Sequence, residues 1–331
     1  MIEDFGNTET GDTVYSVTLS NGPLTARVLS FGGILQDMRV DGHRPSLVLG
    51  FNSFLPYLAE SGYVGATAGR FANRIANGHL EIDGIVYQLD QNFRNQHTLH
   101  GGRFSTAKQL WTIIEKGSAH VSFALTLPDG HMGFPGRLQI TQHWRLSGEW
   151  VLSCTLKAKT DTPTVCNLAH HSYFNLTGRP DMTGHTLEIH ADDYLPVNND
   201  LIPTGEICSV EKTDYDFRQP QKLPAKVPLD FNFCLSPRRQ NLRLVAKLSS
   251  ESGLSLEVST TEPGLQIYDG ANLSTKTAGL NGFAYGPFSG LALEAQLWPD
   301  APNHPHFPSA ILRPGEVYEQ RTEFKISTVN N

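Results

Sequence analysis

The stretch HVSFALTL, residues 120–127, alternates apolar and polar side chains. Its apolar positions are Val121, Phe123, Leu125 and Leu127. Successive side chains of an extended chain point to opposite faces, so this period of two predicts a half-buried antiparallel strand. The same period recurs in EWVLSCTLKAK, residues 149–159, and in GLSLEVST, residues 253–260. Strands of this kind, far apart in the sequence, indicate a chain built largely from antiparallel sheet.

Turn residues support an all-β fold. Asp83-Gly84 separates two apolar runs in LEIDGIVYQL, residues 80–89, and this dipeptide favours a tight β-hairpin turn. The 30 glycines and 20 prolines leave room for few helices, and we expect one short helix within residues 53–60. The pattern by itself predicts a large β-sandwich or a distorted barrel.

Composition limits the class of protein. The 331 residues are 39% hydrophobic and 18% charged, which is typical of a globular chain with a large core. We find neither a repeat nor a linker, and predict one domain over residues 1–331, with the proline-rich residues 220–228 as a loop inside it. The net charge of −7 and the scattered basic residues argue against nucleic acid as a partner. No apolar window is long enough to span a membrane.

The N-terminal sequence and the cysteines indicate a reducing compartment. MIEDFGNTET, residues 1–10, lacks the basic start and apolar run of a signal peptide, so we expect a cytoplasmic protein. None of the cysteines forms a C-x-x-C pair, which argues against a structural zinc site. We therefore expect packing residues or free thiols at Cys154, Cys166, Cys208 and Cys234.

Histidine carries most of the chemical information. Several of the 13 histidines lie in close groups, namely His97 with His100, His170 with His171, and His304 with His306. Three interpretations compete: hydrogen-bonded structural residues, a metal site, and acid–base catalysis together with a carboxylate. An extended HTLH segment, residues 97–100, directs its two histidines to opposite faces, and adjacent histidines diverge likewise. No spacing forces two imidazoles onto one ion, so we predict no metal site.

Strand parity separates the adjacent histidines. In TVCNLAHHSYF, residues 164–174, Asn167, Ala169 and His171 share one face. That face is small and polar, as the lining of a ligand pocket should be. We therefore predict that His171 faces a pocket and that His170 packs in the core. A β-bulge between the two would exchange these roles.

A lone carboxyl group lies in an apolar strand near the C-terminus. In GLALEAQLWPD, residues 290–300, Glu294 falls on the face opposite Leu291 and Leu293. A glutamate in a strand usually lies on a solvated outer face, and this alternative stays open. In PGLQIYDG, residues 263–270, Gln266 and Tyr268 likewise share one face.

Five motifs, in this order along the chain, resemble the aldose 1-epimerases, the galactose mutarotases. They are GRFANRIANG (69–78), TLHGG (98–102), NLAHHSYFNLTG (167–178), DYLPVNNDLIPTGEI (193–207) and LEAQLWPDAPNHPHFPSAILRPGE (293–316). The resemblance extends from about the first expected strand nearly to the C-terminus. It implies the family fold, a large antiparallel β-sandwich of the galactose mutarotase type, the supersandwich, with few short helices.

The resemblance also implies the residues of an active site. His171 matches the general acid, Glu294 the general base, and His100 a second histidine that binds the sugar near its ring oxygen. The matching substrate-binding residues are Asn73, Arg74, Asp230 and Gln266. The implied partner is a free monosaccharide, and no cofactor is implied. We expect a monomer or a homodimer, and the motifs themselves say nothing about an interface.

The implied reaction interconverts the α and β anomers of a free aldose such as glucose or galactose. Ring opening adds a proton to the ring oxygen and removes one from the C1 hydroxyl, tasks that suit an imidazolium and a carboxylate. Opposite charges favour each other, so we expect Glu294 to keep His171 protonated. The alternatives are a non-catalytic sugar-binding module and a hexose-6-phosphate 1-epimerase. Glycoside hydrolysis fits poorly, since it normally needs two carboxylates.

Overall fold

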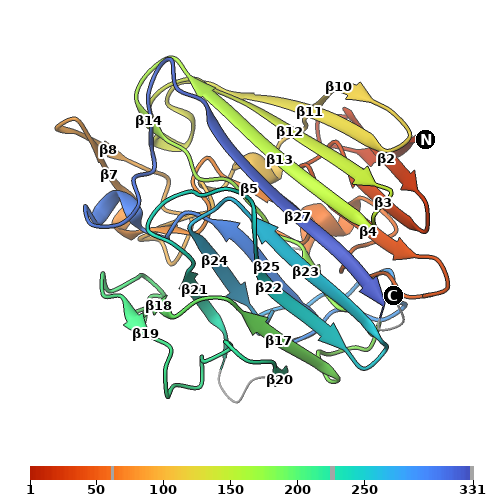
Figure 1. The fold of residues 1–331 in the computed structure, drawn as a ribbon. Helices are drawn as coiled ribbons and strands as arrows, with labels where there is room; N and C mark the ends of the chain where they lie inside the picture. Colours follow the sequence, from red (N-terminus) through yellow and green to blue (C-terminus); the bar gives the residue numbers. More distant parts are fainter. Residues whose placement is uncertain (61–62, 224–227, 329–331) are drawn as a thin grey trace.

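A long antiparallel sheet forms one layer of the molecule (Figure 1). The computed structural model describes residues 1–60, 63–223 and 228–328. Nine strands within these ranges form the long sheet. In spatial order they are β10 (Thr112–Lys116), β11 (His120–Leu127), β12 (Leu138–Ser147), β13 (Val151–Thr160), β27 (Tyr318–Thr328), β23 (Leu254–Thr260), β22 (Arg243–Ser250), β17 (His185–Ile189) and β20 (Gln221–Leu223).

A smaller antiparallel sheet packs against the long one. Six strands of the described chain form it: β16 (Tyr173–Phe174), β25 (Leu291–Gln296), β24 (Gly264–Tyr268), β21 (Asp230–Cys234), β18 (Asp193–Leu195) and β19 (Cys208–Ser209). One apolar cluster joins the layers, with Phe123 and Trp144 from the long sheet and Leu265 and Leu293 from the smaller one. Burial of this apolar surface is the main force that holds the two sheets together. The family fold implied by the resemblance, a large antiparallel sandwich, is confirmed.

The other elements surround these layers. A four-stranded sheet contains β1 (Ile2–Asn7), β2 (Thr13–Asn21), β3 (Leu24–Leu29) and β4 (Leu35–Val40). The short pairs are β5 (Thr67–Ala68) with β15 (Ala169–His170), β6 (Arg74–Ile75) with β9 (Thr98–Leu99), β7 (His79–Ile82) with β8 (Ile85–Gln88), and β14 (Thr164–Val165) with β26 (Ile311–Leu312). The helical elements are α1 (Leu55–Ala59) and the 3₁₀ turns η1 (Ala76–Gly78), η2 (Thr106–Lys108), η3 (His131–Gly133) and η4 (Ala301–Asn303).

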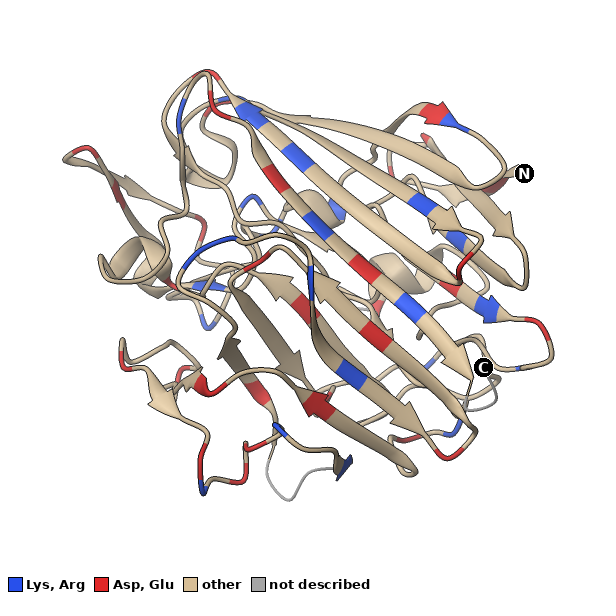
Figure 2. Ribbon diagram, in the orientation of Figure 1, with Lys and Arg blue, Asp and Glu red and all other residues tan. Residues whose placement is uncertain are grey.

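The outer face of the long sheet is charged. Figure 2 shows lysine or arginine alternating with aspartate or glutamate along β27 and on its neighbours. Lys157 on β13 pairs with Glu319 on β27 at 3.1 Å, and Lys247 on β22 pairs with Glu257 on β23 at 3.6 Å. Cross-strand pairs of opposite charge suit a solvated surface. The charged positions of β13 and β27 therefore face water, as the alternation predicted, whereas Ser122 on β11 and Ser255 on β23 are buried at polar positions of the pattern.

Most local predictions are confirmed, and one is wrong. Asp83 and Gly84 both have positive φ in the β7–β8 hairpin, and α1 lies within residues 53–60. The stretch 220–228 is not wholly a loop, because Gln221–Leu223 pair with β17 as an edge strand. Residues 224–227 lie outside the described ranges. None of the described helices has the length and apolar character needed to cross a membrane.

His170 belongs to the core between the sheets. Its ring packs edge-on against Trp144, with the ring centroids 4.7 Å apart, and its Nε2 lies 2.7 Å from the Ser172 hydroxyl. Only 5% of the residue is exposed. Burial lowers the pKa of His170 to about 3, with the adjacent His171 adding to the effect. The folded protein therefore holds this ring neutral at pH values where the unfolded chain binds a proton.

We predict that the cost of His170→Ala depends on pH. At pH 7 the lost packing should lower the free energy of unfolding by about 3 kcal/mol. The folded pKa lies below the unfolded value of 6.5, so the stabilisation by neutral His170 is complete above pH 6.5 and is lost as the pH falls towards 3. At pH 5 the difference in the free energy of unfolding between the wild type and the variant should therefore be smaller by about 2 kcal/mol. This follows from roughly 1.4 kcal/mol for each pH unit below 6.5. Urea unfolding at both pH values measures this, and an unchanged difference would contradict it.

Candidate active site

A cavity of about 260 Å³ opens beside the smaller sheet. Six residues that the family resemblance marked as functional line it: Asn73, Arg74, His100, His171, Asp230 and Glu294. They come from strands or strand ends that are far apart in the sequence. The fold thus gathers most of the predicted site around one space, whose size suits a small polar ligand.

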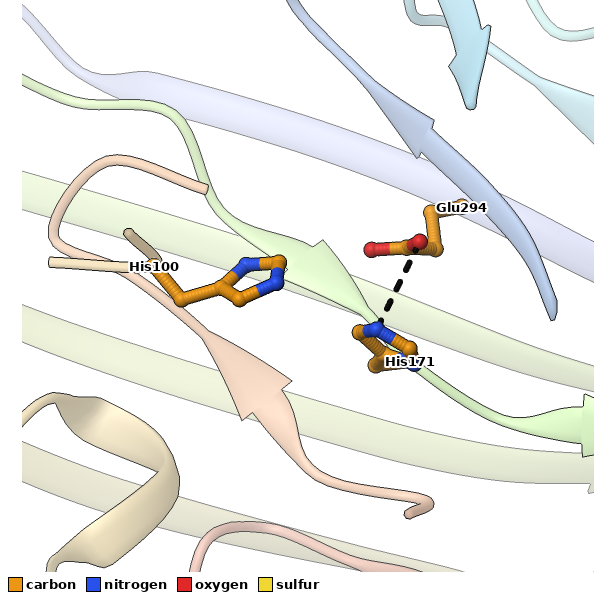
Figure 3. A group of neighbouring side chains, drawn as sticks. All are labelled: His100, His171 and Glu294. Carbon is orange, nitrogen blue, oxygen red and sulfur yellow. Dashed lines mark ion pairs between the residues drawn. The ribbon is translucent and has the colours of Figure 1, made fainter. Parts of the chain in front are cut away.

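His171 and Glu294 lie side by side in the cavity lining, and their side chains point toward each other (Figure 3). His171 directly follows β15, and its backbone bonds Gly65 and Ala66. Glu294 lies within β25, in register with Gln266 on β24. Nε2 of His171 is 3.6 Å from Oε1 of Glu294, and the two residues are only 4% and 2% exposed. An imidazole and a carboxyl group therefore meet in a site that excludes most water.

His100 forms the third side of the group in Figure 3. The β6–β9 pairing places it beside Asn73, and the His100 amide donates to the Asn73 carbonyl at 2.9 Å. In return the Asn73 amide donates to Nδ1 of His100 at 3.1 Å. A backbone N–H can only donate, so Nδ1 is the acceptor and the proton of the neutral ring lies on Nε2. His100 therefore offers a hydrogen-bond donor at its other nitrogen.

Arg74 and Asp230 form an ion pair in the cavity wall. The Arg74 guanidinium donates to Asp230 at 3.1 Å and to the Asn73 side-chain oxygen at 3.4 Å. Gln266 does not line the cavity. Its side-chain amide donates to the other Asp230 oxygen at 2.6 Å. Gln266 therefore holds the Asp230 carboxylate from a position outside the cavity lining.

Strand parity placed two of its three key residues correctly. His171 lines the cavity and His170 packs in the core, as predicted. The prediction for Asn167 is wrong, because this residue is fully buried and does not line the cavity. Glu294 does not lie on a solvated face either, since β25 is buried on both faces. The sequence pattern allowed one face of β25 to be solvated, but other parts of the protein cover that face.

Comparison with known proteins identifies the family. The sequence profile of aldose 1-epimerase matches residues 15–325. The chain is 40% identical to the galactose mutarotase of Mus musculus, in an alignment that covers 96% of this chain and 95% of that protein. The chain belongs to the aldose 1-epimerase family. It is also 35% identical to the aldose 1-epimerase of Escherichia coli strain K12, over 92% of this chain and 93% of that protein.

Solved structures agree with this assignment of the epimerase. An aldose epimerase homologue from C. elegans superposes with a TM-score of 0.89 at 32% identity, covering 95% of this chain and 99% of that chain. A galactose 1-epimerase from Lactobacillus acidophilus gives a TM-score of 0.86 at 27% identity, covering 99% and 98%. The fold and the enzyme class that the motifs implied, an isomerase, are thus confirmed.

Burial controls protonation in the active site of the epimerase. It lowers the pKa of His171 to about 4 and raises that of Glu294 well above its usual range, with Asp230 adding to the second shift. The pKa of His100 also falls well below its usual value, first through burial and then through His171 and Arg74. Burial thus acts against the expectation that Glu294 keeps His171 charged. Desolvation outweighs their attraction and favours the uncharged form of each group.

His100, His171 and Glu294 are also residue types that can bind a metal ion. One ligand atom from each of His100, His171 and Glu294 lies within 4.8 Å of the others, so two histidines do meet despite the spacing in the sequence. Neighbouring histidines do diverge, as His170 and His171 show, but spacing within a segment says nothing about two histidines from different segments. A histidine that binds a metal through one ring nitrogen donates the N–H of its other ring nitrogen to an acceptor. Nδ1 of His100 instead accepts from Asn73, so the proton sits on the nitrogen a metal would need. His100 does not fit a metal site.

Aromatic residues complete the cavity, and the sequence reasoning missed them. The lining includes Tyr63, Phe93, Tyr173 and Tyr268. The Tyr63 ring lies 4.4 Å from that of His100 and nearly parallel to that of His171, at 6.1 Å between centroids. Parity could have found Tyr173, two positions after His171, and Tyr268 had already been placed beside Gln266. No local signal marked Tyr63 or Phe93.

We predict that the epimerase needs no metal and that neutral His100 carries its proton on Nε2. Dialysis against EDTA should leave the rate of anomerisation unchanged, because a ring whose Nδ1 accepts a backbone N–H cannot offer a free Nε2 lone pair. Long-range ¹H–¹⁵N correlation spectra report the tautomer. A rate lost with EDTA and restored by Zn²⁺, or an Nδ1–H tautomer, would contradict the prediction.

Proposed function

We propose that the epimerase interconverts the α and β anomers of a free neutral aldose such as galactose or glucose. The proposal depends on the approach of His171 Nε2 to Glu294 Oε1, 3.6 Å, in the lining of one cavity. The ring oxygen and the hydroxyl of a cyclic aldose share the anomeric carbon. An acid and a base this close together can reach both oxygens of one bound sugar.

The bound sugar sets the direction of proton transfer. Its anomeric hydroxyl donates a hydrogen bond to Glu294, which favours the ionised carboxylate, and its ring oxygen accepts one from protonated His171. His171 then protonates the ring oxygen while Glu294 removes the hydroxyl proton, and the C1–O5 bond breaks to give the aldehyde. Rotation about C1–C2 exposes the other face, and the reverse transfers close the ring. Proton count and charge of the pair are unchanged.

The remaining polar groups orient the sugar in this proposal. His100 donates from Nε2 to an oxygen near the ring oxygen, since its Nδ1 is held by Asn73. Arg74 and Asp230 offer a donor and an acceptor side by side, the pattern that vicinal hydroxyls require. Gln266 serves by holding Asp230 rather than by touching the sugar. Such fixed contacts convert binding energy into orientation of C1 between acid and base.

The charge of the cavity favours this substrate over a hexose 6-phosphate. Among the described lining residues, Arg74 is the one guanidinium and no lysine is present, while the carboxyl groups are Glu60, Asp230 and Glu294. Arg74 is already paired with Asp230. A phosphate would normally be met by unpaired arginines or lysines. A non-catalytic sugar-binding module, the other alternative, would not need a desolvated acid–base pair.

We predict that Glu294→Gln lowers kcat by about 10³-fold while the sugar Kd changes less than about threefold, because the amide keeps the shape but cannot accept the proton. Polarimetry of freshly dissolved α-galactose, corrected for spontaneous mutarotation, gives kcat, and calorimetry gives Kd. His171→Ala should also lose activity, whereas the core variant His170→Ala should retain it per folded molecule. An unimpaired Glu294→Gln enzyme would remove Glu294 as the base.

We predict strong discrimination against phosphorylated sugars. The kcat/KM for galactose 6-phosphate should be at least about a hundredfold below that for galactose, because its charge adds repulsion without an unpaired cation to meet it. NMR saturation transfer between the two anomers measures both rates in the same buffer. Comparable values would instead favour the hexose-6-phosphate 1-epimerase.

We also infer a cytoplasmic enzyme that is a monomer or a homodimer. The free state of Cys154, Cys166, Cys208 and Cys234 supports a reducing compartment, and no feature of the described residues decides between the two assemblies. Both remain predictions.

A further inference from the structure

The part of β25 that carries Glu294 has a strand partner on one side only. β24 pairs along β25 from Ala292 to Gln296. On the other side β16 reaches only Leu291 and Ala292. In the described sheet no strand pairs with the following residues along that edge. All of β25 is buried, so its free backbone groups need partners other than water.

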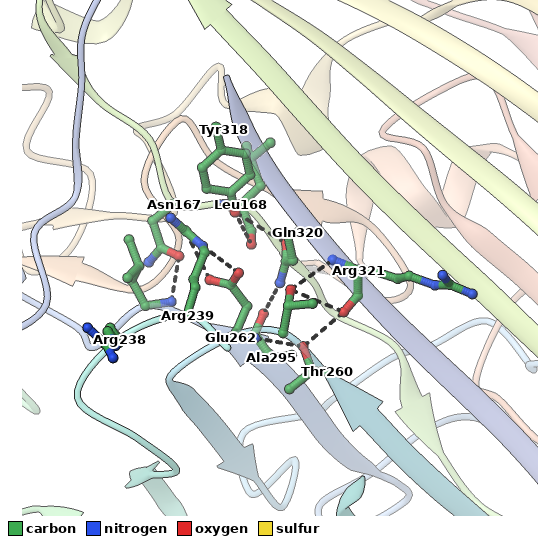
Figure 4. Close-up of polar contacts among 12 residues, drawn as sticks. Asn167, Leu168, Arg238, Arg239, Thr260, Glu262, Ala295, Tyr318, Gln320 and Arg321 are labelled. Carbon is green, nitrogen blue, oxygen red and sulfur yellow. Dashed lines mark hydrogen bonds and ion pairs between the residues drawn. The ribbon is translucent and has the colours of Figure 1, made fainter. Parts of the chain in front are cut away.

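Two buried side chains supply partners for two backbone groups along this edge, the Ala295 carbonyl and the amide of Leu297, which directly follows β25. Nε2 of Gln320, on β27 of the long sheet, donates to the Ala295 carbonyl at 2.6 Å, and Figure 4 shows this contact across the sandwich. Oδ1 of Asn167 accepts from the Leu297 amide at 2.9 Å. Ala295 directly follows Glu294. Side chains, in place of a neighbouring strand, therefore fix the backbone on which Glu294 is carried.

Asn167 also forms hydrogen bonds with the segment that leads to Asn73 and Arg74. Its amide donates to the Arg70 carbonyl at 2.9 Å, its carbonyl accepts from the Ala72 amide at 2.7 Å, and its side chain donates to the Ala72 carbonyl at 3.2 Å. Ala72 precedes Asn73 and Arg74, and Asn167 lies in the segment that leads to His171. One fully buried residue thus joins the three segments that carry the acid, the base and the sugar contacts.

The orientation of Gln320 is fixed by its own neighbours. The Ala295 carbonyl can only accept, so the side-chain nitrogen Nε2 of Gln320 faces it. The Tyr318 hydroxyl lies 3.3 Å from Oε1 of Gln320 and 3.4 Å from the Leu168 carbonyl, either of which can accept its proton. The same hydroxyl accepts from the Leu168 amide at 3.0 Å. Arg239 lies over the Tyr318 ring at 4.4 Å and pairs with the buried Glu262 (Figure 4). These buried neighbours surround the Gln320 side chain, which is 2% exposed.

We propose that Asn167 and Gln320 are positioning residues that set the place of Glu294 against His171. The inference rests on the proposed role of Glu294 as the base. Neither residue lines the cavity, so both act through the backbone of β25. A displacement of about 1 Å at the reacting groups can cost roughly 10²-fold in rate. Loss of either bond should therefore lower kcat more than it weakens sugar binding.

Gln320→Leu tests this inference, with Gln36→Leu as its matched control. Gln36 is also a buried glutamine whose Nε2 donates to a backbone carbonyl, that of Phe51 at 2.8 Å, but it lies on β4 outside the cavity lining. We expect Gln320→Leu to lower kcat by roughly 10- to 100-fold with KM within about threefold. Gln36→Leu should lower only the melting temperature. The stoichiometry of galactose binding in calorimetry corrects both for the folded fraction.

Second variants keep the inference falsifiable if Gln320→Leu does not fold. Gln320→Met keeps the length of the side chain but has no N–H to donate to Ala295, so kcat should again fall. Asn167→Leu removes the bond to Leu297 and should act in the same direction. Variants at Gln320 and Asn167 that keep kcat like the Gln36 control would overturn the inference. An unimpaired Glu294→Gln enzyme would overturn the proposed role of Glu294 first, and this inference with it.

Discussion

The burial of β25 on both faces is the constraint on which the site depends. One face packs against the long sheet, and the other carries Glu294 into the cavity. A strand in this position cannot leave backbone groups or a carboxyl group to be satisfied by bulk water. Its pairing with β24, the bond from Gln320 to the Ala295 carbonyl and the bond from the following Leu297 amide to Asn167 contribute to the first requirement. The second is met only in part, since Oε2 of Glu294 has no protein partner.

The same burial favours the uncharged form of each member of the acid–base pair. Desolvation lowers the pKa of His171 and raises that of Glu294, so neither group is held charged without a ligand. A sugar brings a hydroxyl donor for the carboxylate and an acceptor for the imidazolium, and these contacts favour the charged forms. A bound sugar would thus supply the hydrogen-bond partner that Oε2 of Glu294 lacks within the protein. Buried neutral histidines then make the fold sensitive to acid.

The local pattern predicted individual strands well because neighbouring side chains must alternate between core and solvent. It separated His170 from His171 correctly, since no bulge lies between them. It failed for Asn167, whose face is covered by the Arg70–Ala72 segment and by β25 instead of opening to the cavity. Gln266 was assigned to the sugar by resemblance, yet it holds Asp230 from behind. Parity states which side a residue faces but not what lies on that side.

The sequence by itself determined the alternation that makes sheets, the Asp83-Gly84 hairpin, the short helix and the opposite directions of the two adjacent histidines. Its motifs further indicated the family and thereby most residues of the site. Only the tertiary structure decided that Glu294 is buried, that His100 and His171 meet, and which nitrogen of His100 carries the proton. The physical reason is distance along the chain. Strand pattern depends on residues one or two positions apart, whereas desolvation and hydrogen bonding in the site depend on segments that meet only when the sheets pack.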